Sequence, residues 1–477
     1  MAYLKDLLKQ VTYICTRGTM DCKVTHICHD SRQVVRGSMF ICLAGSREDG
    51  HDYLAQAIRK GAAVCVVSKH VWVEGDVTVI RVRNTSEAMA WIARNYYGAP
   101  AEAMQMIGIT GTKGKTTTAC MLYQMLKEAG VKCGLIGTLG VRRSDGLKKP
   151  GSNTTPDALV LQKELREMAD AGCSCCVMEV SSQGLKMHRV AGIVFDYGIF
   201  TNLSPDHIGP NEHASFEEYQ ECKSLLFRQC KEGIVNADDE HVDGIIKNHT
   251  CKLHTFSCKK DADLMAGAVG YLDEEGQIGM HFTTTGCMNV YAVVHIPGSF
   301  SVYNSLVTML TCHLAGISDE AILRGLDKVK VRGRVELVPV SKDFTVIIDY
   351  AHNEVSTRSV LTTLKEYHPK RLICVYGGGG NRSKLRRYDM GEVTGELADL
   401  SVLTCDNPRD EEIRDINNDI KIGLAKSNGK YIEIEDRKAA IKYCIENAKK
   451  GDMIVLLGKG HEAVSYTHLR AHETRHD

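Results

Sequence analysis

A glycine-rich segment at residues 110–117 constrains the fold of this chain more than any other feature. It reads Thr-Gly-Thr-Lys-Gly-Lys-Thr-Thr and follows an apolar run at residues 104–109, which predicts a buried strand. Residues 118–129 then carry apolar side chains at helical spacing. A strand, a glycine turn and the start of a helix direct backbone N–H groups toward one anion. The segment therefore predicts a phosphate-binding loop inside an α/β domain.

The residues of this loop have different expected roles. Lys115 is placed to reach the β- and γ-phosphates of a nucleotide, and the Thr116 hydroxyl to bind Mg²⁺. The usual pattern has a further glycine at position 109, where this chain has Ile109, so the loop differs from that of most kinases and GTPases. A chance glycine-rich turn is the alternative. The nucleotide contacts are expected from Gly111, Thr112, Lys113, Gly114, Lys115, Thr116 and Thr117.

Length and composition indicate a globular protein of about three domains. Of its 477 residues, 43% are hydrophobic and 25% charged, and Lys plus Arg equals Asp plus Glu at 59 each. The balanced charge gives no reason to expect nucleic acid or an anionic membrane as partner. Residues 1–10 predict an amphipathic helix without the apolar core of a signal peptide, and no apolar stretch is long enough to span a membrane. With 19 cysteines and no secretory signal, a reducing, cytoplasmic location is expected.

The chain divides into three blocks and a tail. Residues 1–98 contain short β-rich runs and a helical segment at 53–59. From 99 to 331 strands alternate with helices, which implies a mostly parallel sheet covered on both faces. Residues 332–463 repeat the alternation, and the glycine run 377–380 follows one of their strands. The expected strands cover residues 38–43, 63–68, 77–82, 104–109, 132–136, 175–180, 197–200, 233–236, 345–349, 371–376, 400–404 and 453–457.

The tail at residues 464–477 has an unusual sequence. Its first part can be written, codon by codon, as a transposase-type sequencing adapter read in frame. We therefore expect a non-native tail, with a natural, polar, frayed end as the alternative. Its histidines are not interpreted as a metal site.

Polar residues at the ends of expected strands are candidates for the chemistry. Glu179 ends an apolar strand, where a second carboxylate near Mg²⁺ is expected in phosphate-loop proteins; a capping or solvated glutamate is the alternative. Asp206 and His207 follow another strand end, where α/β active sites form, and His207 is a candidate ligand of a second Mg²⁺ rather than an ordinary loop histidine. Lys223 lies on a predicted helix, and the pattern alone would make it an exposed lysine.

Three cysteines at positions 173, 175 and 176 raise the question of a metal or redox site. They lie on or beside an expected buried strand, and no second cysteine pair is near them in the sequence. We therefore expect them to act as small apolar residues of the core.

An ordered set of motifs between about residues 29 and 462 resembles the Mur ligase family. The chain is similar in particular to members that add the third residue to UDP-N-acetylmuramoyl-L-alanyl-D-glutamate. No single motif is decisive, but their order is specific. The motifs are His29-Asp30-Ser31-Arg32, Gly37-Ser38-Met39-Phe40, Asp49-Gly50-His51, the loop 111–117, Asn153-Thr154-Thr155-Pro156-Asp157, Met178-Glu179-Val180-Ser181-Ser182, Arg189, Asn202-Leu203-Ser204-x-Asp206-His207, Lys223, Tyr303-Asn304, Gly333-Arg334-x-Glu336, Asp349-Tyr350-Ala351-His352, Arg382, Asp406-Asn407-Pro408-Arg409 and Gly458-Lys459-Gly460-His461-Glu462.

The resemblance implies an α/β fold of three domains: a UDP-sugar-binding domain at 1–98, a central ATP-binding domain at 99–331 and a Rossmann-like, amino-acid-binding domain at 332–463. It also implies a monomeric ATP- and Mg²⁺-dependent ligase of peptidoglycan precursor synthesis that works through an acyl phosphate.

The same resemblance assigns residues to each part of that reaction. The implied catalytic residues are Lys115, Glu179, His207 and a carbamylated Lys223, the last three forming the metal site with Thr116. Further ATP contacts would come from Asn304, Arg334, Asp349 and His352. The UDP-muramoyl-dipeptide would be bound by Ser31, Ser46, Asn153, Thr154, Thr155, Ser181 and Arg189.

The added amino acid is expected to be recognised by the segment 406–409. An arginine fork binds a carboxylate bidentately, which lysine does poorly. meso-Diaminopimelate has a second carboxylate at its far end, which L-lysine lacks. The resemblance implies that the diaminopimelate contacts are Arg382, Asp406, Asn407, Pro408, Arg409, Gly458 and Glu462. A lysine-adding ligase of the same type is the alternative.

Two rival functions stay open at this point. Folylpolyglutamate synthase shares the fold, the phosphate loop and the acyl-phosphate chemistry, but it lacks the UDP-binding type of first domain. A nucleotide-binding regulator without catalysis is a rival of another class, and the joint presence of Glu179, His207 and Lys223 argues against it. Departures from the family at Gln183, Met187, Ser301 and Tyr388 concern affinity more than reaction type.

Overall fold

The computed structural model describes residues 2–45, 48–151, 153–206, 208–209, 212–274 and 277–460. The chain forms two compact units, one of residues 1–263 with 307–317 and the other of residues 264–306 with 318–477. The expected tail at 464–477 lies outside the described residues.

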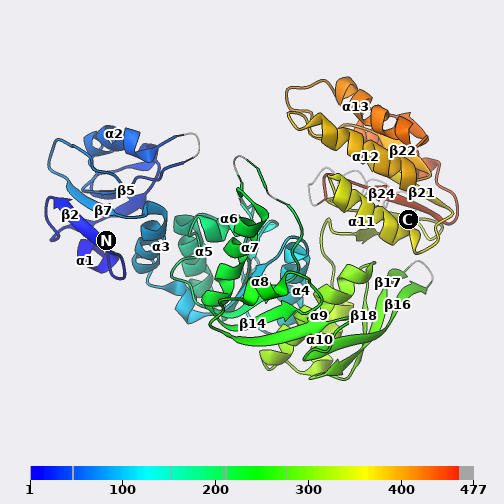
Figure 1. The fold of residues 1–477 in the computed structure, drawn as a ribbon, viewed down its shortest axis with the longest axis horizontal. Helices are drawn as coiled ribbons and strands as arrows, with labels where there is room; N and C mark the ends of the chain where they lie inside the picture. Colours follow the sequence, from blue (N-terminus) through cyan, green and yellow to red (C-terminus); the bar gives the residue numbers. More distant parts are fainter. Residues whose placement is uncertain are drawn as a thin grey trace. The chain divides into compact units, whose positions relative to one another are not determined.

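The first block of the chain folds around a five-stranded sheet with the order β2-β7-β6-β5-β4 (Figure 1). Strands β4 (His26–Cys28), β5 (Ser38–Ile41), β6 (Val64–Val67) and β7 (Thr78–Val82) are parallel, and β2 (Tyr13–Arg17) is antiparallel to β7. Apolar residues of α2 (Leu54–Arg59) and of α3 (Thr85–Tyr96) belong to two different core clusters of this sheet. Each cluster is filled by alternate residues of the strands, so the two faces of the sheet are both covered.

The helix expected at residues 1–10 is wrong in length. The chain there forms a short strand, β1 (Ala2–Tyr3), and one helical turn, α1 (Leu4–Leu7). The leucines at 4, 7 and 8 are buried together in the core. Gln10 then adopts a left-handed φ of 65°, which an α-helix cannot accommodate, and the chain turns into β2.

The central sheet contains the strand that precedes the phosphate loop. Its parallel strands β9 (Cys133–Gly137), β12 (Cys175–Glu179), β8 (Gln105–Thr110), β13 (Phe195–Phe200), β14 (Cys230–Asn236) and β15 (Lys252–Ser257) lie in that order. Strands β10 (Gly140–Arg142) and β11 (Lys148–Lys149) extend it antiparallel beyond β9. The phosphate-loop strand β8 therefore lies between β12 and β13, inside the sheet.

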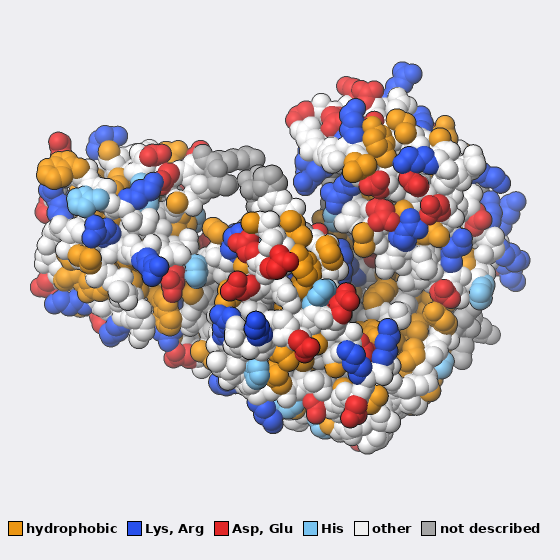
Figure 2. Space-filling view, viewed as in Figure 1, with side chains coloured by type: hydrophobic (Ala, Val, Ile, Leu, Met, Phe, Trp, Pro, Cys, Tyr) orange, Lys and Arg blue, Asp and Glu red, His pale blue; other side chains and the backbone are white. Residues whose placement is uncertain are grey.

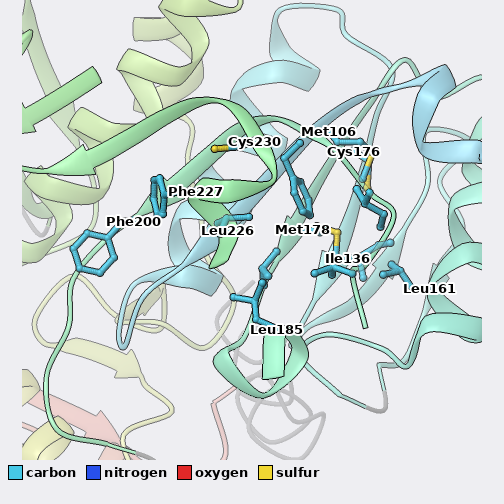
Figure 3. Packing of buried hydrophobic residues seen from close by; sticks show 14 of the residues in the cluster. Met106, Ile136, Leu161, Cys176, Met178, Leu185, Phe200, Leu226, Phe227 and Cys230 are labelled. Carbon is cyan, nitrogen blue, oxygen red and sulfur yellow. The ribbon is translucent and has the colours of Figure 1, made fainter. Parts of the chain in front are cut away.

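Helices cover this sheet as the sequence predicts. Helix α4 (Lys115–Glu128) packs against β8, β9 and β12. Apolar residues of α5 (Ala158–Asp170), α6 (Ser182–Lys186) and α7 (Phe216–Ser224) pack against Met106, Ile136 and Met178 of the strands in one cluster (Figure 3). The three cysteines at 173, 175 and 176 are buried there or beside it, as expected for core residues.

The alternation of parallel strands and helices does not continue to residue 331. Strands β16 (Leu264–Glu274), β17 (Gln277–Gly286) and β18 (Tyr291–Val294) pair antiparallel, and α9 (Ser299–Leu314) and α10 (Asp319–Asp327) follow. Only two residues separate β16 from β17 in the sequence, and so short a connection permits only antiparallel pairing.

The last block folds around a six-stranded sheet with the order β19-β20-β24-β21-β22-β23. The strands are β19 (Glu336–Val338), β20 (Thr345–Ile348), β24 (Asp452–Leu456), β21 (Arg371–Tyr376), β22 (Leu400–Leu403) and β23 (Tyr431–Glu433), and all but β19 are parallel. Helices α11 (Glu354–Lys365), α12 (Lys384–Leu397) and α13 (Ile413–Lys426) share one core cluster, and α14 (Arg437–Glu446) belongs to a second one. This is the doubly covered parallel sheet expected of a Rossmann-like domain.

On the visible face of the molecule, basic and acidic side chains are interspersed, in keeping with the balanced formal charge (Figure 2). Among the residues that the structure describes, none of the helices has the length and apolar character needed to cross a bilayer.

Candidate active site

Four neighbouring strands of the central sheet end at the same edge, and the candidate residues follow them. The phosphate loop leaves β8, Glu179 ends β12, Thr138 comes directly after β9, and Thr201 directly after β13. Because parallel strands place their carboxyl ends together, residues that are far apart in the sequence meet here.

The phosphate loop is fixed by the segment that follows β13. The Thr112 N–H donates to the carbonyl of Asn202 (2.8 Å), the Lys113 N–H donates to its side-chain oxygen (2.9 Å), and the Thr201 hydroxyl donates to the Lys113 carbonyl (2.7 Å). Gly111 has a φ of +147°, and a Cβ at this position would lie 2.0 Å from Thr201 Oγ1. Only glycine fits so close to the neighbouring strand end.

Lys115 begins helix α4 and folds its side chain over the loop. Its Nζ donates to the carbonyls of Gly111 (2.7 Å) and Thr112 (3.0 Å). The ammonium group therefore lies at the mouth of the turn, beside the helix N-terminus, where a phosphate would be expected to bind.

Glu179 connects the phosphate loop with the strand next to it. Its carboxylate, 2% exposed, accepts hydrogen bonds from the Thr116 hydroxyl (2.9 Å), the Thr138 N–H (2.8 Å) and the Thr138 hydroxyl (3.1 Å). Gly137 makes room for it, since a Cβ there would lie 2.3 Å from Glu179 Oε1. These three donors are neutral, so a buried negative charge stands beside a hydroxyl oxygen. Carboxylate and hydroxyl oxygens are the ligands that Mg²⁺ prefers, and the residues present fit this ion.

The sequence pattern alone predicts that Lys223 is an exposed helical lysine, and this prediction is wrong. Its side chain is 1% exposed, and Nζ donates to the carbonyl of Gly111 (2.8 Å) and lies 4.4 Å from the ring centre of Tyr219. The Tyr219 hydroxyl in turn lies 3.1 Å from Thr112 Oγ1. Burial lowers the pKa of Lys223 well below its usual range, and the nearby charge of Lys115 lowers it further.

Four of the expected muramoyl-dipeptide residues also gather at this edge: Thr154, Thr155, Ser181 and Arg189. Thr155 Oγ1 donates to the Glu179 carbonyl (3.0 Å) and accepts from the Ser181 N–H (2.9 Å), and Arg189 donates to the Thr155 carbonyl (2.8 Å). Thr154 reaches the same cluster through Thr138, with 3.0 Å between the two hydroxyl oxygens. The half-buried Arg189 has its pKa lowered by burial. Asn153 is exposed.

In the second unit, part of the expected nucleotide set forms one cluster. Asp349 follows β20 and accepts N–H groups from Val335 (2.8 Å) and Ala351 (2.7 Å). Burial raises the pKa of Asp349, although Arg334 and these hydrogen bonds oppose the shift. Arg334 lies over the ring of Tyr350, 4.9 Å from its centre.

The other two members of that set are placed differently. His352 is exposed and donates from Nδ1 to the Tyr350 carbonyl (2.9 Å). Asn304 is buried on α9.

The expected amino-acid residues lie on three loops that pack against each other. The Gly380 N–H donates to the Asn407 carbonyl (2.8 Å), and Lys459 Nζ donates to Asn407 Oδ1 (3.3 Å). Gly458 lies so close to Asp406 that a Cβ there would be 2.9 Å from the carboxylate. A cavity of about 400 Å³ opens beside these loops, lined by Cys405, Asp406, Ile413, Glu435, Asp436, Arg437, Lys438 and Lys459.

The two arginines expected to bind carboxylates, Arg382 and Arg409, are both exposed. Ser31 in the first sheet domain is buried and donates to Gln56 Oε1 (2.9 Å). Three other candidates, Ser46, His207 and Glu462, lie outside the described residues.

Sequence reasoning missed two residues of this site. Thr138 could have been found from its place two residues after the strand expected at 132–136, at the same sheet edge as Glu179. Tyr219 shows no signal in the sequence, because its role depends on the burial of α7. No group of three or more His, Cys, Asp or Glu suited to a metal ion occurs within the described residues.

Comparison with known proteins places this site in a family context. Three family models match successive parts of the chain: Mur ligase family, catalytic domain, at residues 23–97; Mur ligase middle domain at 109–312; and Mur ligase, glutamate ligase domain, at 333–460. The chain is 40% identical over 465 residues to the UDP-N-acetylmuramoyl-L-alanyl-D-glutamate--2,6-diaminopimelate ligase of Clostridium tetani, covering 96% of this chain and 94% of that protein.

Two solved structures extend the comparison. One, of a ligase with the same name, is 28% identical with a TM-score of 0.72, covering 95% of this chain and 96% of the other. A Mycobacterium tuberculosis folylpolyglutamate synthase complexed with ADP and AMPPCP matches with a TM-score of 0.63 over 81% of this chain and 94% of its own. Its identity is 15%, so it shares the fold alone.

Proposed function

Because the chain belongs to the Mur ligase family, we propose that it joins meso-diaminopimelate to UDP-N-acetylmuramoyl-L-alanyl-D-glutamate, with cleavage of ATP to ADP and phosphate. The relative from Clostridium tetani carries this activity in its name. The proposed domains are 1–98 for the UDP-sugar, 99–331 for ATP and 332–463 for the amino acid. The proposed setting is the cytoplasm, with the protein acting as a monomer.

The observation that carries the proposal is the position of Glu179. Its side chain accepts a hydrogen bond from Thr116 of the phosphate loop, and its main-chain carbonyl accepts one from Thr155. One residue thus connects the loop for the phosphate donor with the loop proposed to bind the carboxylate substrate. A ligase that phosphorylates a carboxylate needs these two groups side by side.

In the proposed reaction, a γ-carboxylate oxygen of D-glutamate attacks the γ-phosphorus of ATP. The bond between this phosphorus and ADP breaks, and an acyl phosphate forms. The amine of diaminopimelate then attacks the acyl carbon, phosphate leaves, and the amine loses a proton as the amide forms. Negative charge gathers around the transferred phosphoryl group in the first step, and Lys115 lies where it can offset that charge.

Mg²⁺, when bound, would neutralise charge on the phosphate oxygens. Among the described residues, Thr116 and Glu179 would hold it, and His207 is the further candidate. We propose that Lys223 completes this set as a carbamate: the neutral amine bonds to the carbon of CO₂ and loses one proton. Burial and Lys115 favour the neutral amine, and the product would offer carboxylate oxygens to the metal.

For the amino acid, the proposal assigns Arg409 and Arg382 to the distal carboxylate of diaminopimelate. An exposed guanidinium can form two parallel hydrogen bonds with a carboxylate. L-Lysine also has an ammonium group at that end but lacks the carboxylate, so the two arginines would face a cation without the anion that they bind. Diaminopimelate is therefore favoured over lysine.

A competition experiment tests the proposal. The purified protein is incubated with ATP, Mg²⁺, the UDP-muramoyl-dipeptide and equal amounts of meso-diaminopimelate and L-lysine, and the product is identified by mass. The diaminopimelate tripeptide is expected, with none from a Lys115→Ala variant. A lysine tripeptide would overturn the amino-acid assignment and keep the ligase.

Omitting the UDP-muramoyl-dipeptide separates the rival functions. ATP turnover is expected to stop without it. Turnover with a folate substrate instead would favour the folylpolyglutamate synthase activity, and nucleotide binding without turnover under any condition would favour a regulator.

A further inference from the structure

Arg387 on α12 is a buried basic residue that the proposed reaction does not use. Its side chain is 3% exposed. Nη1 and Nη2 donate to Glu411 Oε2 and Oε1, both at 2.8 Å, as a two-pronged ion pair. Nη1 also donates to Asp419 (2.9 Å), and Nη2 to the carbonyl of Gly379 (3.0 Å). The N–H groups of both terminal nitrogens are thus engaged in one fixed arrangement.

Two of the three partners of Arg387, Gly379 and Glu411, belong to the loops that carry Arg382 and Arg409, and the third, Asp419, lies on α13. Gly379 lies in the glycine turn after β21, three residues before Arg382, and Glu411 lies two residues after Arg409. Glu411 also accepts from the backbone N–H of Asn381, the residue next to Arg382. One carboxylate and one guanidinium therefore join both loops to each other and to helix α12.

Two further bonds hold the same loops together. The Gly380 N–H donates to the Asn407 carbonyl (2.8 Å), and Asn381 Nδ2 donates to Asp410 (2.8 Å). Removing Arg387 would leave two carboxylates, Glu411 and Asp419, without their common cation, and removing Glu411 would leave Arg387 with Asp419 alone of these two carboxylates. Of the contacts described here, the loops would then keep the hydrogen bonds of the Gly380 N–H and of the Asn381 side chain.

We propose that Arg387 and Glu411 are positioning residues that fix Arg382 and Arg409 for the distal carboxylate of the added amino acid, and so set its affinity and selectivity. This inference rests on the proposed function. Neither residue touches the amino acid; the pair acts through the backbone of the two loops. A displacement of about 1 Å in a positioning element can cost up to about 10²-fold in efficiency.

The test compares Glu411→Gln and Arg387→Lys with a matched control. The exposed pair of Glu392 and Lys426 (2.9 Å) joins the same two helices, α12 and α13, away from the loops, so Glu392→Gln serves as control. Both test variants are expected to raise KM for meso-diaminopimelate roughly tenfold or more, with kcat and the KM of ATP and of the UDP-muramoyl-dipeptide near those of the parent. The control is expected to leave all four constants unchanged.

Selectivity gives a second readout that loss of stability would not change. The ratio of diaminopimelate to lysine incorporation is expected to fall in Glu411→Gln and Arg387→Lys, and to stay constant in Glu392→Gln. An unchanged KM and ratio in a folded variant would overturn the inference, as would an equal rise in KM for all three substrates.

Hydrogen exchange separates failure of this inference from failure of the proposed function. The amides of Gly380 and Asn381 are expected to exchange faster in Glu411→Gln than in the parent and the control, whether or not diaminopimelate is the substrate. If the parent protein uses lysine, the substrate assignment fails while faster exchange still supports the positioning pair. If the protection of both amides is unchanged, this result alone refutes the positioning role of Arg387 and Glu411.

Discussion

The phosphate loop and the proposed amino-acid loops are held in place in opposite ways. Around the phosphate loop, the side chains proposed for the chemistry are themselves buried, as Glu179 and Lys223 show. In the C-terminal domain, Arg382 and Arg409 are exposed, and a buried residue behind them, Arg387, fixes their backbone. The first arrangement suits a reaction that is the same for every substrate, and the second suits recognition of one amino acid.

If the two regions differ in this way, substitutions near the phosphate loop should lower kcat, and those in the C-terminal loops should raise the KM of the amino acid alone. The following variants test that division.

The largest effect is expected for Glu179→Gln. The amide keeps the size and can still accept the Thr138 N–H, but it removes the charge proposed to hold Mg²⁺. We expect kcat to fall by about 10²–10³-fold with an unchanged KM for diaminopimelate, measured by steady-state product formation. If the variant is as active as the parent, Glu179 has no role in the reaction.

Lys223→Ala should follow, with kcat lowered by about 10²-fold. Because the missing group is proposed to be a carboxylate, acetate should restore part of the activity, while Lys231→Ala, at an exposed lysine on β14, should need no rescue. The intact mass of the gently prepared parent should exceed the sequence mass by one CO₂. If acetate restores neither the rate nor the metal dependence of Lys223→Ala, the carbamate is contradicted.

Arg409→Lys tests the other side of the comparison. It keeps the charge and loses the two-pronged geometry, so KM for diaminopimelate should rise roughly tenfold while kcat stays near the parent value. The control is Arg414→Lys, an exposed arginine on α13. A fall in kcat with an unchanged KM would place Arg409 in the reaction instead of in recognition.

A smaller effect is expected for Thr138→Val. The variant removes the hydroxyl that donates to Glu179 and leaves the backbone N–H in place. Loss of one such hydrogen bond corresponds to about 1 kcal/mol, or roughly fivefold in kcat. Thr138→Ser, which retains the hydroxyl, should match the parent.

The smallest effect concerns stability and pH. Arg387 lowers the pKa of Glu411 to about 2, against about 4.3 for a free glutamate. A lowered carboxyl pKa stabilises the fold above the unfolded-state value, and that stabilisation is lost as the pH falls from about 4.3 to 2. The difference in urea midpoint between the parent and Glu411→Gln should therefore be largest at neutral pH and shrink through this range. A constant difference would show that the ion pair does not contribute through its charge.

Much of the fold could be predicted from the sequence, because short apolar runs bounded by turn residues favour buried strands. The expected strands around residues 104–109, 175–180 and 371–376 match β8, β12 and β21 within one residue. The antiparallel strands β16–β18 were missed, because their pairing depends on a short connection and not on a distinctive composition. Exact domain boundaries stay a prediction.

The site was predictable only in part, for a related reason. The phosphate loop is local in sequence, so its residues could be named directly. The burial of Lys223 depends on how α7 packs against a loop about a hundred residues away in sequence, which no local pattern contains. The same holds for Arg387, whose partners come from two other loops and a neighbouring helix.

The glycine turn at 377–380 has a consequence for how this protein can change over evolution. A side chain at Gly380 would lie 1.7 Å from the Pro408 carbonyl oxygen, and one at Gly377 would lie 2.1 Å from that of Thr404. Gly377 and Gly380, beside the proposed amino-acid site, therefore cannot be replaced by residues with a side chain unless the backbone moves. The exposed arginines beside it tolerate replacement far more easily, so a lineage could exchange one amino-acid substrate for another by altering a few surface side chains while the surrounding chain path stays the same.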